Sequence, residues 1–351
     1  MKKKRKRISV LLFLFIYIFL APEYENNTLK FSPAWVVNAF KPELGGAEKN
    51  SLIPFRLGQV FGYFDRSGKI SFIDRVFYNT AQNKKYFINY TSVTENLVVN
   101  KNDGTFVSNL KTAGYPYFID DRLFVISANS KKISEWSIEG ENIFSYENES
   151  EIISSDANID TYIAGFVDGS VIITDKDRKI EKLMKPELSR INAVYGLAIS
   201  SDSELIAMIT GLDPQYMIIM KKKHTQYSRI FTYQFNNNLR HSRYITFSDD
   251  NRYLFFESEN IFYCYDFLTK SLSSTSLEGK ISAVHYLPDS GFSAVKTDGP
   301  AGQSYFYLIY PDGSIMYRNK SKSGNVFMTG SGGRFYFGTG NSIYSVDMLD
   351  D

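Results

Sequence analysis

The 351-residue sequence predicts an all-β fold of seven or eight similar units, and three observations support this prediction. From residue 51 onward, short apolar runs alternate with turns rich in Gly, Asp, Asn and Ser. No stretch shows the apolar spacing of an amphipathic helix. Aromatic residues make up 16% of the chain, with 28 Phe and 25 Tyr, and aromatic side chains favour half-buried strands.

The first 21 residues have the composition of a targeting segment. Six consecutive basic residues (2–7) precede an apolar run (8–21), which would span roughly 21 Å as a helix, less than the roughly 30 Å hydrocarbon core. We expect a signal peptide or an uncleaved N-terminal membrane anchor, with the basic end in the cytoplasm and the rest exported. Both alternatives stay open, because Pro22 directly after Ala21 makes a poor cleavage site. The predicted location is the periplasm or the outer face of the cytoplasmic membrane.

The remaining chain divides into a linker and one domain. Residues 22–50 contain Pro and Gly without a sustained apolar period, as is typical of a linker, and residues 51–351 form the all-β domain. The formal net charge is +2, but without the six basic residues of the leader 34 Lys and Arg stand against 38 Asp and Glu. The body of the protein is therefore mildly acidic, which argues against nucleic acid as a partner.

One phrase recurs along the domain in degenerate form. The segment GLAISSDSELIAMITG (196–211) reads as strand, Ser-Asp hinge, strand and tight turn, and RYITFSDDNRYLFFESEN (243–260) has the same order. Most of the turns expected between second and third strands follow each other at intervals near forty residues. These turns fall near Ser67, Asp103, Asn129, Asp168, Asp213, Glu259, Gly302 and Gly340.

A forty-residue period of four short antiparallel strands predicts a β-propeller of seven or eight blades. One four-stranded sheet cannot bury both of its faces, so neighbouring blades must stack around an axis. An unrelated β-sandwich or a parallel β-solenoid is the alternative, although solenoid coils are usually shorter. The last unit (326–348) supplies only three strands, so we expect an N-terminal strand, LIPFRLG (52–58), to complete it and close the ring.

The strand–hinge–strand pattern of LAISSDSELIAMITG, together with the DGS turns at 168–170 and 312–314, resembles the WD-repeat and quinoprotein-like β-propeller superfamily. The resemblance covers residues 51–351 and consists of the repeat pattern, without the Trp-Asp and Gly-His signatures. It implies a propeller that binds other proteins, and it implies no catalytic residue.

The sequence contains no recognisable catalytic, cofactor or metal motif. His224, His241 and His285 fall in different units, so we expect them to act independently rather than as a metal site. Cys264 is the single cysteine and lies in a strand-like run, which predicts a small buried residue. Two carboxylate pairs stand at strand hinges, where such side chains cap turns: Asp120-Asp121 and Asp249-Asp250.

A local basic cluster is the one charge feature that indicates a binding surface. We expect its side chains to gather on one rim and to dock an acidic partner, an anionic lipid or the cell-wall polymer; the alternative is a solvated loop. The predicted partner-binding residues are Lys221, Lys222, Lys223, Arg229, Arg240 and Arg243.

These observations favour an exported, membrane-tethered β-propeller that serves as a non-catalytic protein-interaction scaffold, with protein partners in a bacterial cell envelope. The alternative is a propeller enzyme, of hydrolase or dehydrogenase type, with its active site at the mouth of the central tunnel. Carboxylates and histidines from several blades converging on the axis would favour the enzyme. A sensor is less favoured, because only seven residues precede the apolar run.

Overall fold

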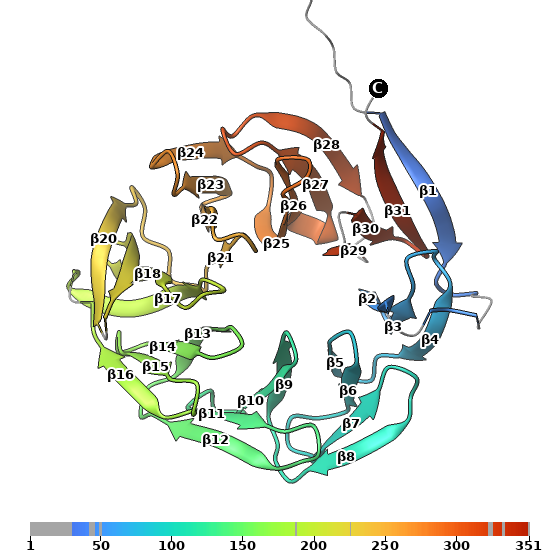
Figure 1. The fold of residues 1–351 in the computed structure, drawn as a ribbon, viewed down its shortest axis with the longest axis horizontal. Coiled ribbons are helices and arrows are strands. Elements are labelled where there is room, and N and C mark those ends of the chain that lie inside the picture. The colour runs from blue at the N-terminus through green and yellow to red at the C-terminus, as the bar shows by residue number, and fades with distance from the viewer. Residues whose placement is uncertain are drawn as a thin grey trace, which may run out of the picture.

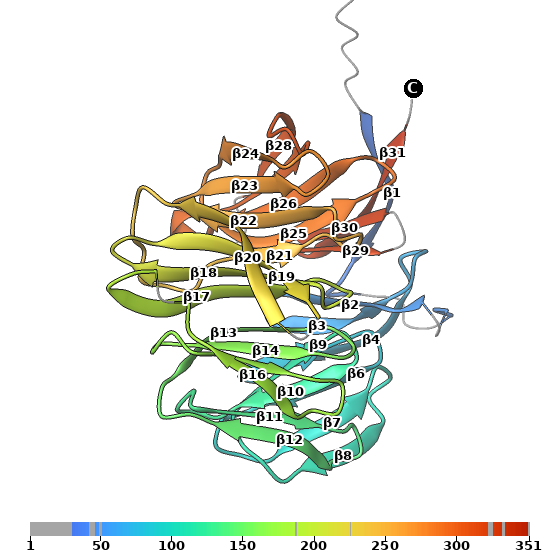
Figure 2. The ribbon, with the colours of Figure 1, turned by 60° about the vertical axis from the view of Figure 1, so that its left-hand side comes forward.

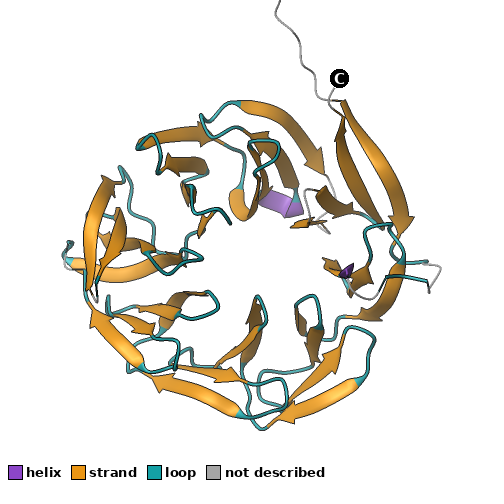
Figure 3. Cartoon of the chain, in the orientation of Figure 1, coloured by secondary structure: helices purple, strands orange, loops and turns teal. Residues whose placement is uncertain are grey.

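A computed structural model describes residues 30–41, 46–48, 51–186, 188–224, 226–321, 326–331 and 334–349. Its strands form eight sheets arranged in a ring around a central axis (Figure 1). Strands and loops make up nearly all of this part of the chain (Figure 3). The predicted all-β propeller is confirmed, and the blade number is eight. The predicted leader, 1–21, lies outside the described residues, and among these residues no helix is long and apolar enough to span a membrane.

The blades follow the chain order, and in blades 2 to 8 four antiparallel strands run from the axis outward. Blade 1 contains β2 (Ile53–Leu57), β3 (Val60–Phe64) and β4 (Ile70–Arg75). Blade 2 contains β5 (Asn79–Gln82), β6 (Tyr86–Tyr90), β7 (Leu97–Lys101) and β8 (Phe106–Leu110). Blade 3 contains β9 (Tyr115–Ile119), β10 (Arg122–Ile126), β11 (Lys132–Trp136) and β12 (Asn142–Glu147). Blade 4 contains β13 (Ile152–Ala157), β14 (Tyr162–Phe166), β15 (Val171–Thr174) and β16 (Ile180–Met184).

The second half of the ring repeats this pattern. Blade 5 contains β17 (Ile191–Ile199), β18 (Leu205–Leu212), β19 (Tyr216–Lys223) and β20 (Gln226–Gln234). Blade 6 contains β21 (Ile245–Phe247), β22 (Tyr253–Ser258), β23 (Ile261–Asp266) and β24 (Ser271–Ser276). Blade 7 contains β25 (Lys280–Leu287), β26 (Phe292–Asp298), β27 (Ser304–Ile309) and β28 (Ile315–Ser321). Blade 8 contains β29 (Val326–Ser331), β30 (Arg334–Thr339), β31 (Ser342–Leu349) and, from the N-terminal side, β1 (Lys30–Asn38).

The hydrophobic core lies between the blades. All eight residues of β18 are buried, because blade 5 is covered on both faces by its neighbours. Between blades 5 and 6, for example, Ile209 and Met217 belong to the same apolar cluster as Phe256 and Tyr263, whose rings stack in parallel at 4.9 Å. This packing explains why the middle strands read as continuous apolar runs rather than as alternating patterns.

An N-terminal strand closes the ring, but it is not the expected one. Residues 52–58 form β2 of blade 1, whereas β1 pairs antiparallel with β31 and completes blade 8 (Figure 2). Residues 30–38 of the predicted linker therefore belong to the propeller. Pro33 made this segment resemble a linker in the sequence. A proline is tolerated in this strand because β1 lies at a sheet edge and is irregular between Pro33 and Trp35.

Trp35 fixes β1 to the ring. Its ring lies 5.7 Å from that of Phe64 in blade 1 and 6.0 Å from that of Tyr336 in blade 8, and its Nε1 donates a hydrogen bond to the Arg66 carbonyl (2.9 Å). The closing strand thus contacts the first blade as well as the last.

Blade 1 departs from the repeat because it has three strands. We call the face that carries the turns between the first and second strands of blades 2 to 8 the first face, and the opposite one the second face. Blade 1 has an odd number of strands, and each of them runs in the opposite direction to the corresponding strand of the other blades. β4 therefore ends on the second face, where β5 begins. The Asn89 side chain connects blade 2 to the end of β4: it donates to the Arg75 carbonyl (2.8 Å) and accepts from the Phe77 N–H (3.1 Å).

Seven of the eight expected turns join second and third strands, and the one near Asp103 does not. Asp103 lies between β7 and β8, the third and fourth strands of blade 2. The short interval that follows Asp103 in the sequence results from this misplacement, because the corresponding turn of blade 2 falls between Tyr90 and Leu97.

Candidate interaction surfaces

The turns of the first face are joined to each other by side-chain amides. In three places an asparagine in one blade bonds the turn of the adjacent blade, which satisfies backbone groups that the turns leave unpaired. The bonds join Asn83 to the Asp120 carbonyl (3.0 Å), Asn158 to the Ser200 carbonyl (2.8 Å) and Asn251 to the Ser201 N–H and hydroxyl (2.9 and 2.8 Å). These contacts fix neighbouring blades in position.

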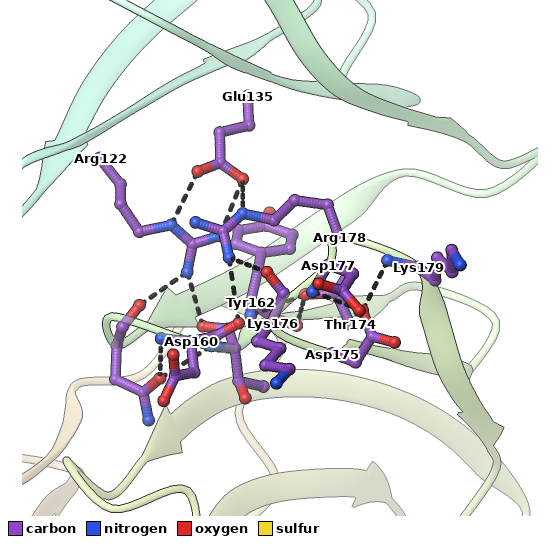
Figure 4. Close-up of polar contacts among 12 residues, drawn as sticks. Arg122, Glu135, Asp160, Tyr162, Thr174, Asp175, Lys176, Asp177, Arg178 and Lys179 are labelled. Atoms are coloured by element: carbon purple, nitrogen blue, oxygen red, sulfur yellow. Dashed lines mark hydrogen bonds and ion pairs between the residues drawn. The ribbon is translucent and has the colours of Figure 1, made fainter.

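A buried ion cluster joins blades 3 and 4. The Arg122 guanidinium donates two hydrogen bonds of 2.8 Å to the Glu135 carboxylate, and the Arg178 Nε lies 2.8 Å from the same carboxylate (Figure 4). The Arg122 Nη1 also donates to the carbonyls of Asn158 (2.6 Å) and Thr161 (2.9 Å). Only 3% of the Glu135 side chain is exposed, so both arginines satisfy a charge that water does not reach.

A second polar group lies on the inner strands of blades 3 and 4. The Tyr117 hydroxyl lies 3.0 Å from the Ser155 hydroxyl, and the neighbouring Asp156 accepts hydrogen bonds from the Ile199 N–H (2.9 Å) and the Ala157 N–H (2.8 Å). Burial raises the pKa of Asp156 to about 7, despite these two hydrogen bonds. The bond from the Ile199 N–H ties blade 4 to blade 5, whereas the bond from the Ala157 N–H lies within β13.

The histidines do not join this group. His224 follows β19, His241 lies between β20 and β21, and His285 lies on β25. Among the residues that the structure describes, no three or more His, Cys, Asp or Glu side chains are arranged to hold a metal ion.

The predicted basic cluster divides between the two faces. Lys221, Lys222 and Lys223 end β19 at the first face, with Arg229 nearby on β20 opposite Met220. We call these four cations the basic corner; Lys222 is partly buried, with its Nζ 5.7 Å from the Tyr227 ring, and the other three are exposed.

The two remaining cations lie at the other end of the blade. Arg240 is exposed, but Arg243 is only 5% exposed, and both lie on the second face between β20 and β21. The length of β20 separates Lys221–Lys223 from Arg240 and Arg243. Burial lowers the pKa of Arg243 from its usual value. The six residues therefore do not form one rim.

The ring also matches known proteins. A family model described as a beta-propeller protein matches residues 1–350. The chain belongs to this β-propeller family. An uncharacterized protein of Treponema pallidum (strain Nichols) is 25% identical over 207 residues, which are 59% of this chain and 55% of the relative. The chain thus spans about half the length of that curated relative.

The crystal structure of BamB from Moraxella catarrhalis has the same overall fold as this β-propeller protein. The match covers 91% of this chain and 100% of that chain, with a TM-score of 0.62 and 12% sequence identity. At this identity the likeness concerns the fold alone. The comparisons support the propeller superfamily in general and do not specify its WD-repeat or quinoprotein-like members.

Sequence reasoning missed one surface of this propeller. Phe77, Tyr78 and Tyr115 are 63%, 57% and 38% exposed and lie on the second face, where blades 1 to 3 meet. We call these three residues the aromatic rim. A signal was present in the sequence: the link between two strands reads Val-Phe-Tyr (76–78), whereas the other turns are rich in Gly, Asp, Asn and Ser.

Cys264 is buried on β23, as its sequence context predicts. Its side chain packs in the core between blades 6 and 7, and burial raises the pKa of the thiol to about 12. The thiol is therefore protonated at neutral pH and inaccessible to reagents.

Proposed function

We propose that this protein is an exported, membrane-tethered β-propeller that serves as a non-catalytic protein-interaction scaffold in a bacterial cell envelope. The observation that carries the proposal is the position of β1. This strand begins at Lys30, shortly after the predicted leader ends at Ala21, and it completes the blade that closes the ring. A membrane segment at 8–21 would lead directly into the closing blade, and at about 3.5 Å per residue the connection would reach roughly 28 Å.

The basic corner supports the interaction role. Its four cations lie on one hairpin of a domain whose sequence is net acidic, and the hairpin belongs to a ring held by buried polar contacts between its blades. A local positive field on a rigid support attracts an acidic protein surface and speeds its encounter. The enzyme alternative would need a free acid–base group, and Asp156 is engaged by two backbone N–H groups.

Removing the three lysines of the basic corner should weaken partner binding without unfolding the ring. We expect the Lys221→Ser, Lys222→Ser, Lys223→Ser variant to recover several-fold less partner from the native envelope at low salt, and to lose the salt sensitivity of wild-type recovery. Its melting temperature should stay near that of wild type, because Lys221 and Lys223 are exposed, Lys222 is only partly buried, and a surface ion pair contributes about 0–1 kcal/mol. Crosslinked affinity capture at two salt concentrations measures both effects.

The matched control carries the same change of charge on blade 4: Lys176→Ser, Lys179→Ser, Lys185→Ser. This variant should retain the recovery and the salt response of wild type. Equal losses in the two triple variants would show that net charge, rather than the basic corner, determines binding. If partner recovery and its salt response change in neither variant, the basic corner does not bind the partner.

A further inference from the structure

The aromatic rim is a second surface that faces away from the basic corner. Phe77 and Tyr78 form the link from β4 to β5, and Tyr115 begins β9. All three lie on the second face, whereas the basic corner lies on the first face. Residues 76–78 join the third and last strand of blade 1 to β5 on this face.

The backbone of this link is held in place. The Val76 N–H donates to the Gln59 carbonyl (2.9 Å), the Phe77 N–H to the Asn89 side chain (3.1 Å) and the Tyr78 N–H to the Tyr90 carbonyl (3.0 Å). Val76 itself is buried. Phe77 and Tyr78 are thus presented to solvent on an ordered backbone, which reduces the conformational entropy that a partner's binding would remove.

Two exposed arginines lie at the second-face ends of β2 and β4. Arg56 is exposed at the end of β2 and donates to the Asn79 side chain, and Arg75 is exposed at the end of β4. Asp74, whose carboxylate accepts the Arg75 N–H (2.7 Å), is the neighbouring carboxylate on β4, so these three side chains leave a net positive charge. Exposed aromatic rings with adjacent arginines are the composition of protein-binding hot spots.

Tyr90 lies close to both the aromatic rim and Arg56. The rings of Tyr78 and Tyr90 lie 5.8 Å apart, and Tyr90 is buried below the rim. Burial raises the pKa of the Tyr90 hydroxyl, Tyr78 and Tyr115 raise it further, and Arg56 opposes them. Groups from blades 1, 2 and 3 therefore surround one point of the second face.

The direction of the tether argues for a protein partner rather than the membrane. Lys30 pairs with Leu349 at the end of β31, so the chain enters β1 from the first face. In a tethered ring the second face would then point away from the membrane that holds the chain. We propose that the aromatic rim binds a short acidic segment of a protein partner, with an apolar side chain of that segment among the three rings and its carboxylates beside Arg56. This inference rests on the proposed scaffold function and assigns it a second surface.

Site-specific photocrosslinking tests the proposal. The full-length chain carrying Phe77→p-benzoylphenylalanine is irradiated in its native envelope, and the adducts are identified by peptide mass spectrometry. We expect one discrete protein adduct whose crosslinked segment carries Asp or Glu next to an apolar residue. Tyr78→Ala should lower the adduct yield at least tenfold, and Arg56→Gln should lower it several-fold. The melting temperatures should remain near that of wild type, because these side chains are exposed.

The control places the same probe at Phe106, which is 62% exposed on β8 and so matches Phe77 in accessibility. Its adduct yield should be at most one tenth of that at Phe77. Equal yields at the two positions, a lipid or glycan adduct, or a neutral or basic protein segment would overturn the inference. If Phe77 gives no adduct while the basic corner still supports salt-sensitive capture, the aromatic rim fails and the scaffold function stands. If neither surface recovers a protein, both fail.

Discussion

A chain that begins at residue 39 should unfold about 10 °C below a chain that begins at residue 30. The shorter chain lacks β1, so β31 loses its pairing and Trp35 no longer packs against Phe64 and Tyr336. Trp35 is partly buried, so its loss costs up to about 3–5 kcal/mol, the range for large aromatic side chains, and the unpaired edge of β31 adds to this cost. Because the entropy of unfolding grows with chain length, each kcal/mol lowers the melting temperature of a chain of about 320 residues by about 1.5 °C.

The seam beside the closing blade adds to this expectation. A cavity of about 220 Å³ lies between blades 7 and 8, lined among others by Phe306, Tyr317, Phe337 and Tyr344. The packing at this seam is therefore incomplete, so we expect the ring to depend more on β1 for closure. Scanning calorimetry compares the two chains, and Trp35→Ala in the full chain should give an intermediate value. Equal melting temperatures for the chains that begin at 30 and 39 would contradict closure by β1.

Glu135→Gln should lower the free energy of unfolding by about 3–5 kcal/mol. The variant leaves the partly buried Arg122 and Arg178 guanidinium groups, whose side chains are 10% and 21% exposed, without their shared buried counter-charge, and breaking such a pair from one side is strongly destabilising. Urea denaturation measures the change. Because the cluster joins blades 3 and 4, the whole ring should lose stability.

An exposed ion pair supplies the matched control. Lys85 and Asp121 are 2.6 Å apart, with 61% and 64% of their side chains exposed. Asp121→Asn also removes one carboxylate charge from an ion pair, but it should leave the free energy of unfolding nearly unchanged, because solvent screens exposed pairs. Similar small losses in Glu135→Gln and Asp121→Asn would show that the buried cluster does not hold the blades together.

The repeat could be predicted from sequence because each blade carries its own local signals. Apolar strands such as 205–212 and DGS turns such as 168–170 recur at the spacing of a blade, and both result from the stacking of four-stranded sheets. The exceptions lie where the blade itself is irregular. Blade 1 has three strands, and its aromatic link at 76–78 lacks the usual turn residues.

The closing strand and the candidate surfaces were harder to predict because long-range packing determines them. Pro33 made β1 resemble a linker, and the pairing with β31 joins residues at opposite ends of the sequence. Lys221 and Arg243 are close in sequence, yet one blade length separates them and Arg243 is buried. In the sequence, the residues of the Glu135 ion cluster resemble ordinary surface charges. Only the packing of blade 3 against blade 4 brings them together.

We propose that this β-propeller is exported and presents its surfaces outside the cytoplasm, and cysteine labelling in intact cells tests this proposal. Leu268 is 74% exposed on the turn after β23, whereas Cys264 is 1% exposed and remains a protonated thiol, so wild type serves as the unlabelled control. We expect Leu268→Cys in the full-length chain to react with a maleimide that cannot cross the cytoplasmic membrane. Reaction of Leu268→Cys only after the cells are lysed would contradict export of the propeller.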